Sequence, residues 1–98
     1  MDIGTAIRTI RKELKITRNE LALKTGMSAN GLFNIENNLC FPSKETMRKI
    51  CSILNIPPAY LMFFAITDED MSAESWIIFK ALQNPLKDAL LKDISNNK

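Results

Sequence analysis

Histidine is absent from this 98-residue chain, and its absence excludes several kinds of chemistry. Without imidazole there is no Ser-His-Asp or Cys-His arrangement and no histidine metal site. Cysteine is scarce, and Cys40 and Cys51 stand too far apart for a C-x-x-C pair, so we expect two reduced core thiols. No nucleophile–base pair is visible. The sequence therefore predicts no enzyme, metal, cofactor or small-molecule ligand.

Long apolar runs are also missing. No stretch approaches the roughly 18 residues of a membrane-spanning helix, and no basic-then-apolar leader opens the chain. Apolar residues at 46% and charged residues at 24% are ordinary values for a folded domain. We therefore expect a cytoplasmic, unprocessed protein that binds no membrane.

Charge is distributed unevenly although the net charge is only +2. Residues 1–65 carry nine basic and five acidic side chains, whereas residues 66–98 carry four basic and six acidic ones. A basic front and an acidic tail are typical of two parts with different partners. An ordinary solvated surface would give the same count, and charge alone does not separate the two interpretations.

Helix signals dominate the first two thirds of the chain. Ile3, Ile7, Ile10 and Leu14 repeat at helical spacing, and Thr17 to Glu20 forms a capping box. Capping serines, a glycine stop and a proline pair divide the rest into short segments. The predicted helices span about residues 2–15, 17–26, 28–36, 43–54 and 57–64.

Beyond residue 65 the composition changes. An acidic hinge over residues 67–70 separates a domain of residues 1–65 from an extension of residues 66–98. Ser72 can cap a sixth helix, and Asn84-Pro85 favours the start of a seventh. A short strand at 76–79 is the alternative there, because β-propensity is high.

Two short helices joined by Gly26-Met27-Ser28 are the most informative feature. A glycine-containing turn of this length fits a helix-turn-helix, and Ala22 is small enough for a close helix crossing. A helical corner that only packs would have the same spacing. Further short segments in order favour the first interpretation, and these are Ile16–Ala22, Thr25–Ser28, Leu32–Asn37, Pro42–Ser43 and Ile53–Ile56.

With these segments the sequence resembles the Cro/CI-type (Xre) helix-turn-helix family of phage and bacterial regulators. The resemblance runs from about Ile3 to Leu61. It implies an all-α fold, a five-helix lambda-repressor-like DNA-binding domain with one or two extra C-terminal helices.

The resemblance makes residues 28–36 the recognition helix, with its N-terminal half in the major groove. The predicted base contacts are Ala29, Asn30, Phe33 and Asn34. Asparagine can pair with adenine, and phenylalanine or alanine can touch a thymine methyl group. Solvent-exposed filler is the alternative for the asparagines, and packing against Phe41 is the alternative for Phe33.

The resemblance also implies contacts to the DNA backbone and one structural ion pair, Arg11 with Glu36. A lone surface arginine is the alternative for Arg18. The predicted phosphate contacts are Thr17, Arg18, Ser28, Asn37, Ser43 and Lys44.

Apolar residues surround nearly a full helical turn at 76–79, so one side can pack on the front domain and the other needs a partner. Completion of the monomer's own core is the alternative. The residues predicted to form a dimer interface are Trp76, Ile77, Phe79, Leu82, Leu86, Leu90 and Ile94.

These features together predict a sequence-specific regulator of transcription that binds double-stranded DNA. We expect a homodimeric repressor on a palindromic operator. The alternative is a protein-interaction module, or an antitoxin-like partner, whose C-terminal helices bind another protein.

Overall fold

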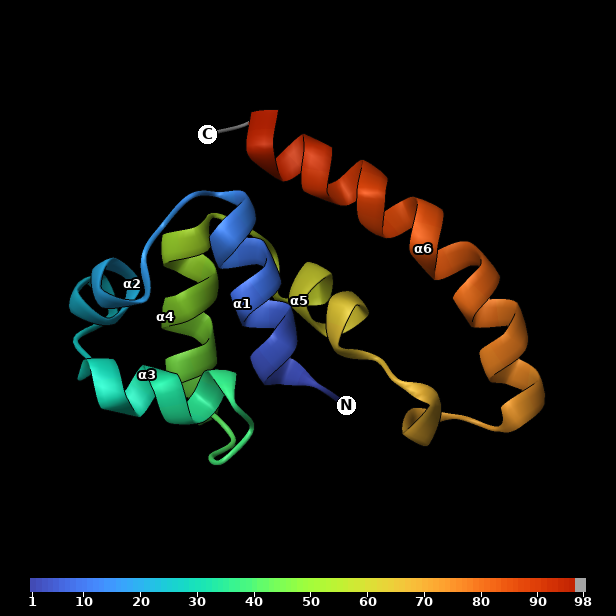
Figure 1. The fold of residues 1–98 in the computed structure, drawn as a ribbon, viewed down its shortest axis with the longest axis horizontal. Helices are drawn as coiled ribbons and strands as arrows, with labels where there is room; N and C mark the ends of the chain where they lie inside the picture. Colours follow the sequence, from blue (N-terminus) through green and yellow to red (C-terminus); the bar gives the residue numbers. More distant parts are fainter. Residues whose placement is uncertain (97–98) are drawn as a thin grey trace.

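The computed structural model describes residues 1–96 of the chain. All of the regular structure in this part is helical, and no strand occurs in it. Figure 1 shows the first five helices gathered together, with the last helix along the side away from α3. The elements are α1 (Ile3–Glu13), α2 (Arg18–Thr25), α3 (Ala29–Glu36), α4 (Lys44–Leu54), α5 (Pro58–Ala65), the 3-10 turn η1 (Asp68–Asp70) and α6 (Ala73–Asn96).

Local hydrogen bonds explain where the short helices begin. The hydroxyl of Thr17 accepts from the amide of Glu20, whose carboxylate accepts in return from the amide of Thr17. At the starts of α3 and α4 the hydroxyls of Ser28 and Ser43 accept from the amides of Gly31 and Thr46. Gly26 ends α2 with a φ of 74°, a left-handed conformation that glycine adopts without a steric penalty. The predicted starts of α2, α3 and α4 and the glycine stop of α2 are confirmed.

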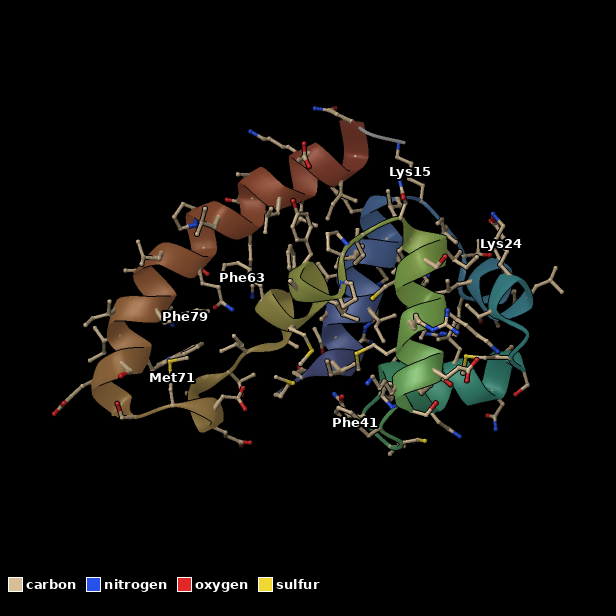
Figure 2. All side chains as sticks on the ribbon, turned by 180° about the vertical axis from the view of Figure 1, so that it is seen from behind. Lys15, Lys24, Phe41, Phe63, Met71 and Phe79 are labelled. Atoms are coloured by element: carbon tan, nitrogen blue, oxygen red, sulfur yellow. The ribbon has the colours of Figure 1, made fainter. Side chains whose placement is uncertain are left out.

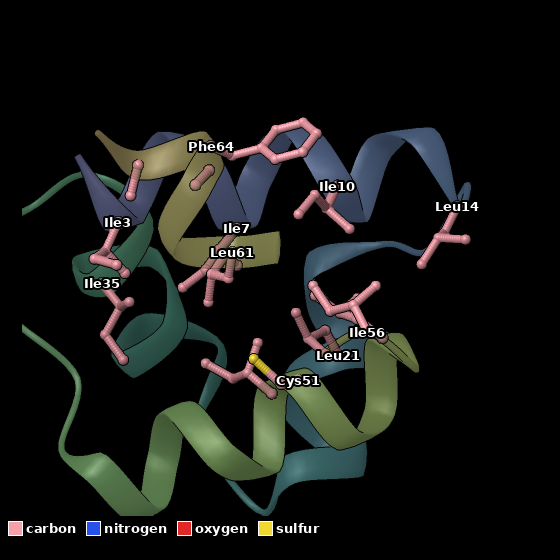
Figure 3. Packing of buried hydrophobic residues seen from close by; sticks show 14 of the residues in the cluster. Ile3, Ile7, Ile10, Leu14, Leu21, Ile35, Cys51, Ile56, Leu61 and Phe64 are labelled. Carbon is pink, nitrogen blue, oxygen red and sulfur yellow. The ribbon is translucent and has the colours of Figure 1, made fainter. Parts of the chain in front are cut away.

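Buried apolar side chains from all six helices form one core. Figure 3 shows part of it from close by. Cys51 is part of this core, and burial raises the pKa of its thiol. Cys40 lies exposed in the loop after α3, so the prediction of two core thiols is wrong for this residue. The largest fully buried side chains are Ile3, Ile7, Ile10, Leu21, Leu32, Glu36, Ile50, Leu54 and Leu61.

Gly4 lets α1 pass unusually close to the last turn of α3. A Cβ atom on Gly4 would lie 2.6 Å from the carbonyl oxygen of Glu36 and closer still to that of Ile35. Asn38, at a φ of 58°, holds this crossing, because its side chain accepts from the amide of Gly4 and donates to Asp2. Sequence reasoning did not single out Gly4, since nothing local distinguishes it from a weak helix residue.

The extension is a single helix of 24 residues with Pro85 inside it, so the predicted break at Asn84-Pro85 is wrong. Proline lacks an amide hydrogen and crowds the preceding turn, which costs helix stability. Contacts on both sides offset that cost. The side-chain Nε2 of Gln83 donates to the backbone carbonyls of Phe63 and Ile66, and Ile94 is buried in the core. The alternative of a strand at 76–79 is also wrong, because these residues are part of the same helix.

The predicted division at residue 65 stays a prediction. In the structure, α6 contacts both α1 and α5. Within residues 1–96 no helix combines the length and the apolar character needed to cross a bilayer.

Candidate DNA-binding face

The turn between α2 and α3 fixes the angle between the two helices. The amide of Met27 donates to the carbonyl of Ala22 at 2.8 Å, and the hydroxyl of Thr25 donates to the carbonyls of Leu21 and Ala22. Leu32 of α3 is fully buried between the helices. The outer face of α3 therefore has a fixed position relative to the other helices.

The predicted base-contacting residues all lie on this outer face. Ala29 and Asn30 are exposed, Phe33 is 41% exposed, and Asn34 is half-buried. Between Ser28 and Asn38 the sequence contributes no lysine or arginine to this face. A surface of amides and small apolar groups suits adenine and thymine, whereas guanine is most often read by arginine or lysine.

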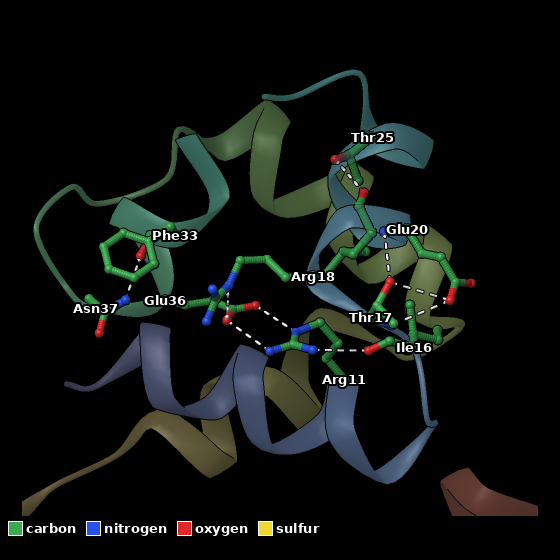
Figure 4. Close-up of polar contacts among 10 residues, drawn as sticks. Arg11, Ile16, Thr17, Arg18, Glu20, Thr25, Phe33, Glu36 and Asn37 are labelled. Atoms are coloured by element: carbon green, nitrogen blue, oxygen red, sulfur yellow. Dashed lines mark hydrogen bonds and ion pairs between the residues drawn. The ribbon is translucent and has the colours of Figure 1, made fainter. Parts of the chain in front are cut away.

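A buried ion pair ties α1 to the end of α3. The Nε of Arg11 donates to Oε2 of Glu36 at 2.7 Å, and its Nη2 donates to Oε1 at 3.0 Å (Figure 4). The Nη1 of Arg11 donates to the carbonyl of Ile16, so the guanidinium also holds the loop before α2. Both charged side chains are buried. The pair that the resemblance implies is thus present.

Arg18 reaches the same carboxylate from α2. Its Nε donates to Oε1 of Glu36 at 3.2 Å, and its guanidinium carbon lies 5.1 Å from the centre of the Phe33 ring. The side chain is 34% exposed. Arg18 is therefore no lone surface residue, and no sequence pattern indicated either contact. Within residues 1–96 there is no ring contact between Phe33 and Phe41, which itself lies exposed.

Most of the predicted phosphate contacts lie exposed at helix ends. Thr17, Ser28 and Ser43 use their hydroxyl oxygens as caps, and the side chain of Asn37 donates to the carbonyl of Phe33 at 2.8 Å. Lys44 is exposed in the first turn of α4. A helix N-terminus disfavours a cation, so a phosphate beside Lys44 would remove that penalty.

The predicted dimer residues divide into two sets on α6. Phe79 packs against Phe63 of α5 with ring centres 5.7 Å apart, and Figure 2 shows both rings between the two helices. Leu90 packs on the chain's own core, and Ile94 lies inside it. These three side chains pack within the monomer, and their assignment to a dimer interface stays a prediction.

The outward side of α6 carries a stripe of four exposed side chains, Ile77, Ile78, Leu82 and Leu86. We call it the α6 stripe. Ile78 was not among the predicted interface residues. Trp76 is half-buried, and its ring stacks on that of Phe79 with ring centres 6.1 Å apart.

Residues 4–63 match the family described as a helix-turn-helix domain. Three curated relatives match between 54 and 63 residues of the chain. The HTH-type transcriptional repressor RghR of Bacillus subtilis (strain 168) is 40% identical over 63 residues, which are 63% of this chain and 47% of that protein.

Two further relatives come from Bacillus phage phi105. The immunity repressor protein is 38% identical over 57% of this chain and 39% of its own length. The ImmF control region 10 kDa protein is 35% identical over 55% of this chain and 60% of its own length. The chain thus spans less than two thirds of each relative that it matches. No solved structure matches it significantly.

Proposed function

This chain belongs to the Xre-type helix-turn-helix domain family, and on that premise we propose that it is a sequence-specific DNA-binding repressor of transcription. The observation that carries the proposal is the outer face of α3, where the predicted base-contacting side chains gather on a helix fixed by a buried core. Two of the three relatives are named as repressors, which supports the same direction of control.

Base readout would come from amide and apolar groups. The side chains of Asn30 and Asn34 can each donate to N7 and accept from N6 of an adenine in the major groove. Ala29 and Phe33 offer apolar contact to thymine methyl groups. The proposed operator is therefore rich in A·T pairs at the positions that α3 reaches.

The DNA backbone would be held from both sides of α3. The capped N-termini of α2 and α4 present amide groups with a favourable dipole for a phosphate. Lys44 adds a cation at the start of α4, and the exposed part of Arg18 adds one at the start of α2. Such contacts set the register on the duplex without reading its sequence.

The α6 stripe supports a homodimer. Its four large apolar side chains stand exposed on one side of a helix whose other side is already packed. A second copy can cover the stripe with an identical stripe, since a two-fold interface is self-complementary. Each α3 helix of such a dimer would read one half-site, and the operator would be palindromic.

A different protein could cover the same α6 stripe, and this is the alternative function. A selection experiment separates the two. The purified chain is incubated with a random-sequence duplex library at moderate salt, and bound duplexes are sequenced. The Asn30→Ala/Asn34→Ala variant serves as the control, because both changes lie outside the core.

We expect the wild-type protein to enrich an A·T-containing inverted repeat with half-site centres about 10–10.5 base pairs apart. The control variant should lose this preference and keep its fold. Uniform binding that vanishes with added salt, or no binding, would overturn the proposal. A stable complex with a non-identical protein would then favour the alternative.

A further inference from the structure

The contacts of Arg18 with Glu36 and Phe33 assign it a second task, and we propose that it is a positioning residue that fixes Phe33 as a reader of a thymine methyl group. The assignment rests on the proposed function, because it deepens the way in which α3 would read DNA. Phe33 is the specificity-determining residue in this account, and Arg18 acts through it.

The position of the Phe33 ring points to a surface role. Its side chain is 41% exposed on the outer face of α3, while Leu32 beside it is fully buried. An aromatic side chain that only filled the core would be covered on all sides. One face of this ring has the guanidinium of Arg18 over it, and Phe33 keeps 41% of its surface exposed.

The guanidinium is itself held in place by a chain of contacts. Arg18 donates from Nε to Glu36, and Glu36 accepts two further hydrogen bonds from Arg11. The Glu36 side chain is fully buried, so the carboxylate is a rigid anchor at the end of α3. A planar guanidinium fixed at one edge is a stable platform for an aromatic ring.

Lysine is a poor substitute for Arg18 in this arrangement. Its ammonium group is a compact point charge with no planar face, so it can pair with a carboxylate or a phosphate but cannot cover a ring in the same way. Arg18→Lys therefore separates two roles. It keeps the charge that a phosphate contact needs and removes the platform under Phe33.

A ring fixed on the outer face of α3 suits an apolar group in the major groove. The C5 methyl of thymine is the only such group that a base presents there. Deoxyuridine differs from thymidine only in lacking this methyl, so it is a direct probe. Each thymine of the duplex enriched by the wild-type protein is replaced by deoxyuridine, one at a time, and the affinity is measured.

For the wild-type protein we expect a loss of about fourfold at one thymine per half-site, which corresponds to one buried methyl group. Phe33→Ala should abolish this sensitivity. Arg18→Lys should also abolish it while keeping the salt dependence of binding. Asn34→Ala is the matched control, since its reader role concerns adenine, and it should keep the sensitivity to deoxyuridine.

Thermal unfolding shows whether each variant is folded, and Phe33→Ala carries the test alone if Arg18→Lys is not. A folded Arg18→Lys variant that keeps the full deoxyuridine effect would overturn the positioning role. A wild-type protein that prefers one sequence but ignores every deoxyuridine would overturn the assignment of Phe33 and leave the proposed function standing. A wild-type protein with no sequence preference would overturn both.

Discussion

Arg11 and Glu36 join the first helix to the third through two hydrogen bonds, at 2.7 and 3.0 Å, in the interior of the domain. The same carboxylate also accepts from Arg18, so one buried anion fixes three helices. Removing one partner of a buried ion pair is costly, because the remaining charges lose their compensation.

Glu36→Gln should therefore lower the free energy of unfolding by about 3 kcal/mol, since it strands the buried Arg11. Urea unfolding followed by circular dichroism measures the change. Glu45→Gln is the matched control, because the pair of Glu45 with Arg48 is exposed and should contribute less than about 1 kcal/mol. Equal effects of the two substitutions would show that the buried pair contributes no more to stability than the exposed pair.

Asp2 should make stability depend on pH. Burial acts to raise its pKa, but hydrogen bonds from Asn38 and Thr5 and the charge of Arg8 outweigh it and hold the pKa below the usual range. A lowered pKa in the folded state means that the stabilisation is complete above the unfolded value of about 3.9 and is lost as the pH falls through the folded value.

The matched variant is Asp2→Asn, which keeps a good N-cap acceptor for α1 but does not titrate. Urea unfolding midpoints between about pH 5 and pH 2 should fall more steeply for the wild-type protein than for this variant. Asp70, whose pKa is lowered by hydrogen bonds from Thr67 and the terminal amine, is present in both proteins. Parallel pH profiles would contradict the role given to Asp2.

Leu82→Asp should convert a dimer into a folded monomer. Leu82 is 59% exposed in the middle of the α6 stripe, so a charge there is harmless to the monomer but opposes burial against a second copy. Sedimentation equilibrium gives the mass and circular dichroism gives the helix content. Asn84→Asp adds the same charge to an exposed position beside the stripe and should leave the dimer intact. A wild-type monomer at all concentrations would refute the homodimer.

Two single variants should distinguish a base contact from a phosphate contact by their effects on DNA affinity. Asn34→Ala should cost about 1–3 kcal/mol on the selected duplex alone and relax the preference at one position. Lys44→Ala should weaken binding to every duplex alike and reduce the slope of log affinity against log salt by about 1. Uniform loss for Asn34→Ala, or a sequence-dependent loss for Lys44→Ala, would reverse these assignments.

Much of the fold was predictable because its signals are local. The Thr17 capping box, the Ser28 and Ser43 caps and the stop at Gly26 each depend on residues within one turn, and the structure contains all of them. The same kind of signal misled at Pro85, where local preference favours a helix start. Contacts of Gln83 and Ile94 with the body outweigh that preference, and they come from distant parts of the chain.

The site was predictable only in part. Helical spacing places Asn30 and Phe33 on one face, but it does not show that the guanidinium of Arg18 lies over Phe33. That contact depends on the crossing of α2 and α3 and on the shared carboxylate of Glu36. The division of α6 into a packed side with Leu90 and an exposed side with Ile78 likewise follows from where the helix lies on the body.

The most direct test of DNA recognition by α3 is a ratio of two affinities at one fixed salt concentration. The first is for the inverted repeat enriched by the wild-type protein, and the second is for a duplex of the same composition in shuffled order. We predict a ratio of about 10³ or more in favour of the inverted repeat. Equal affinities, with the same dependence on salt, would mean that the chain holds the DNA backbone and reads no sequence.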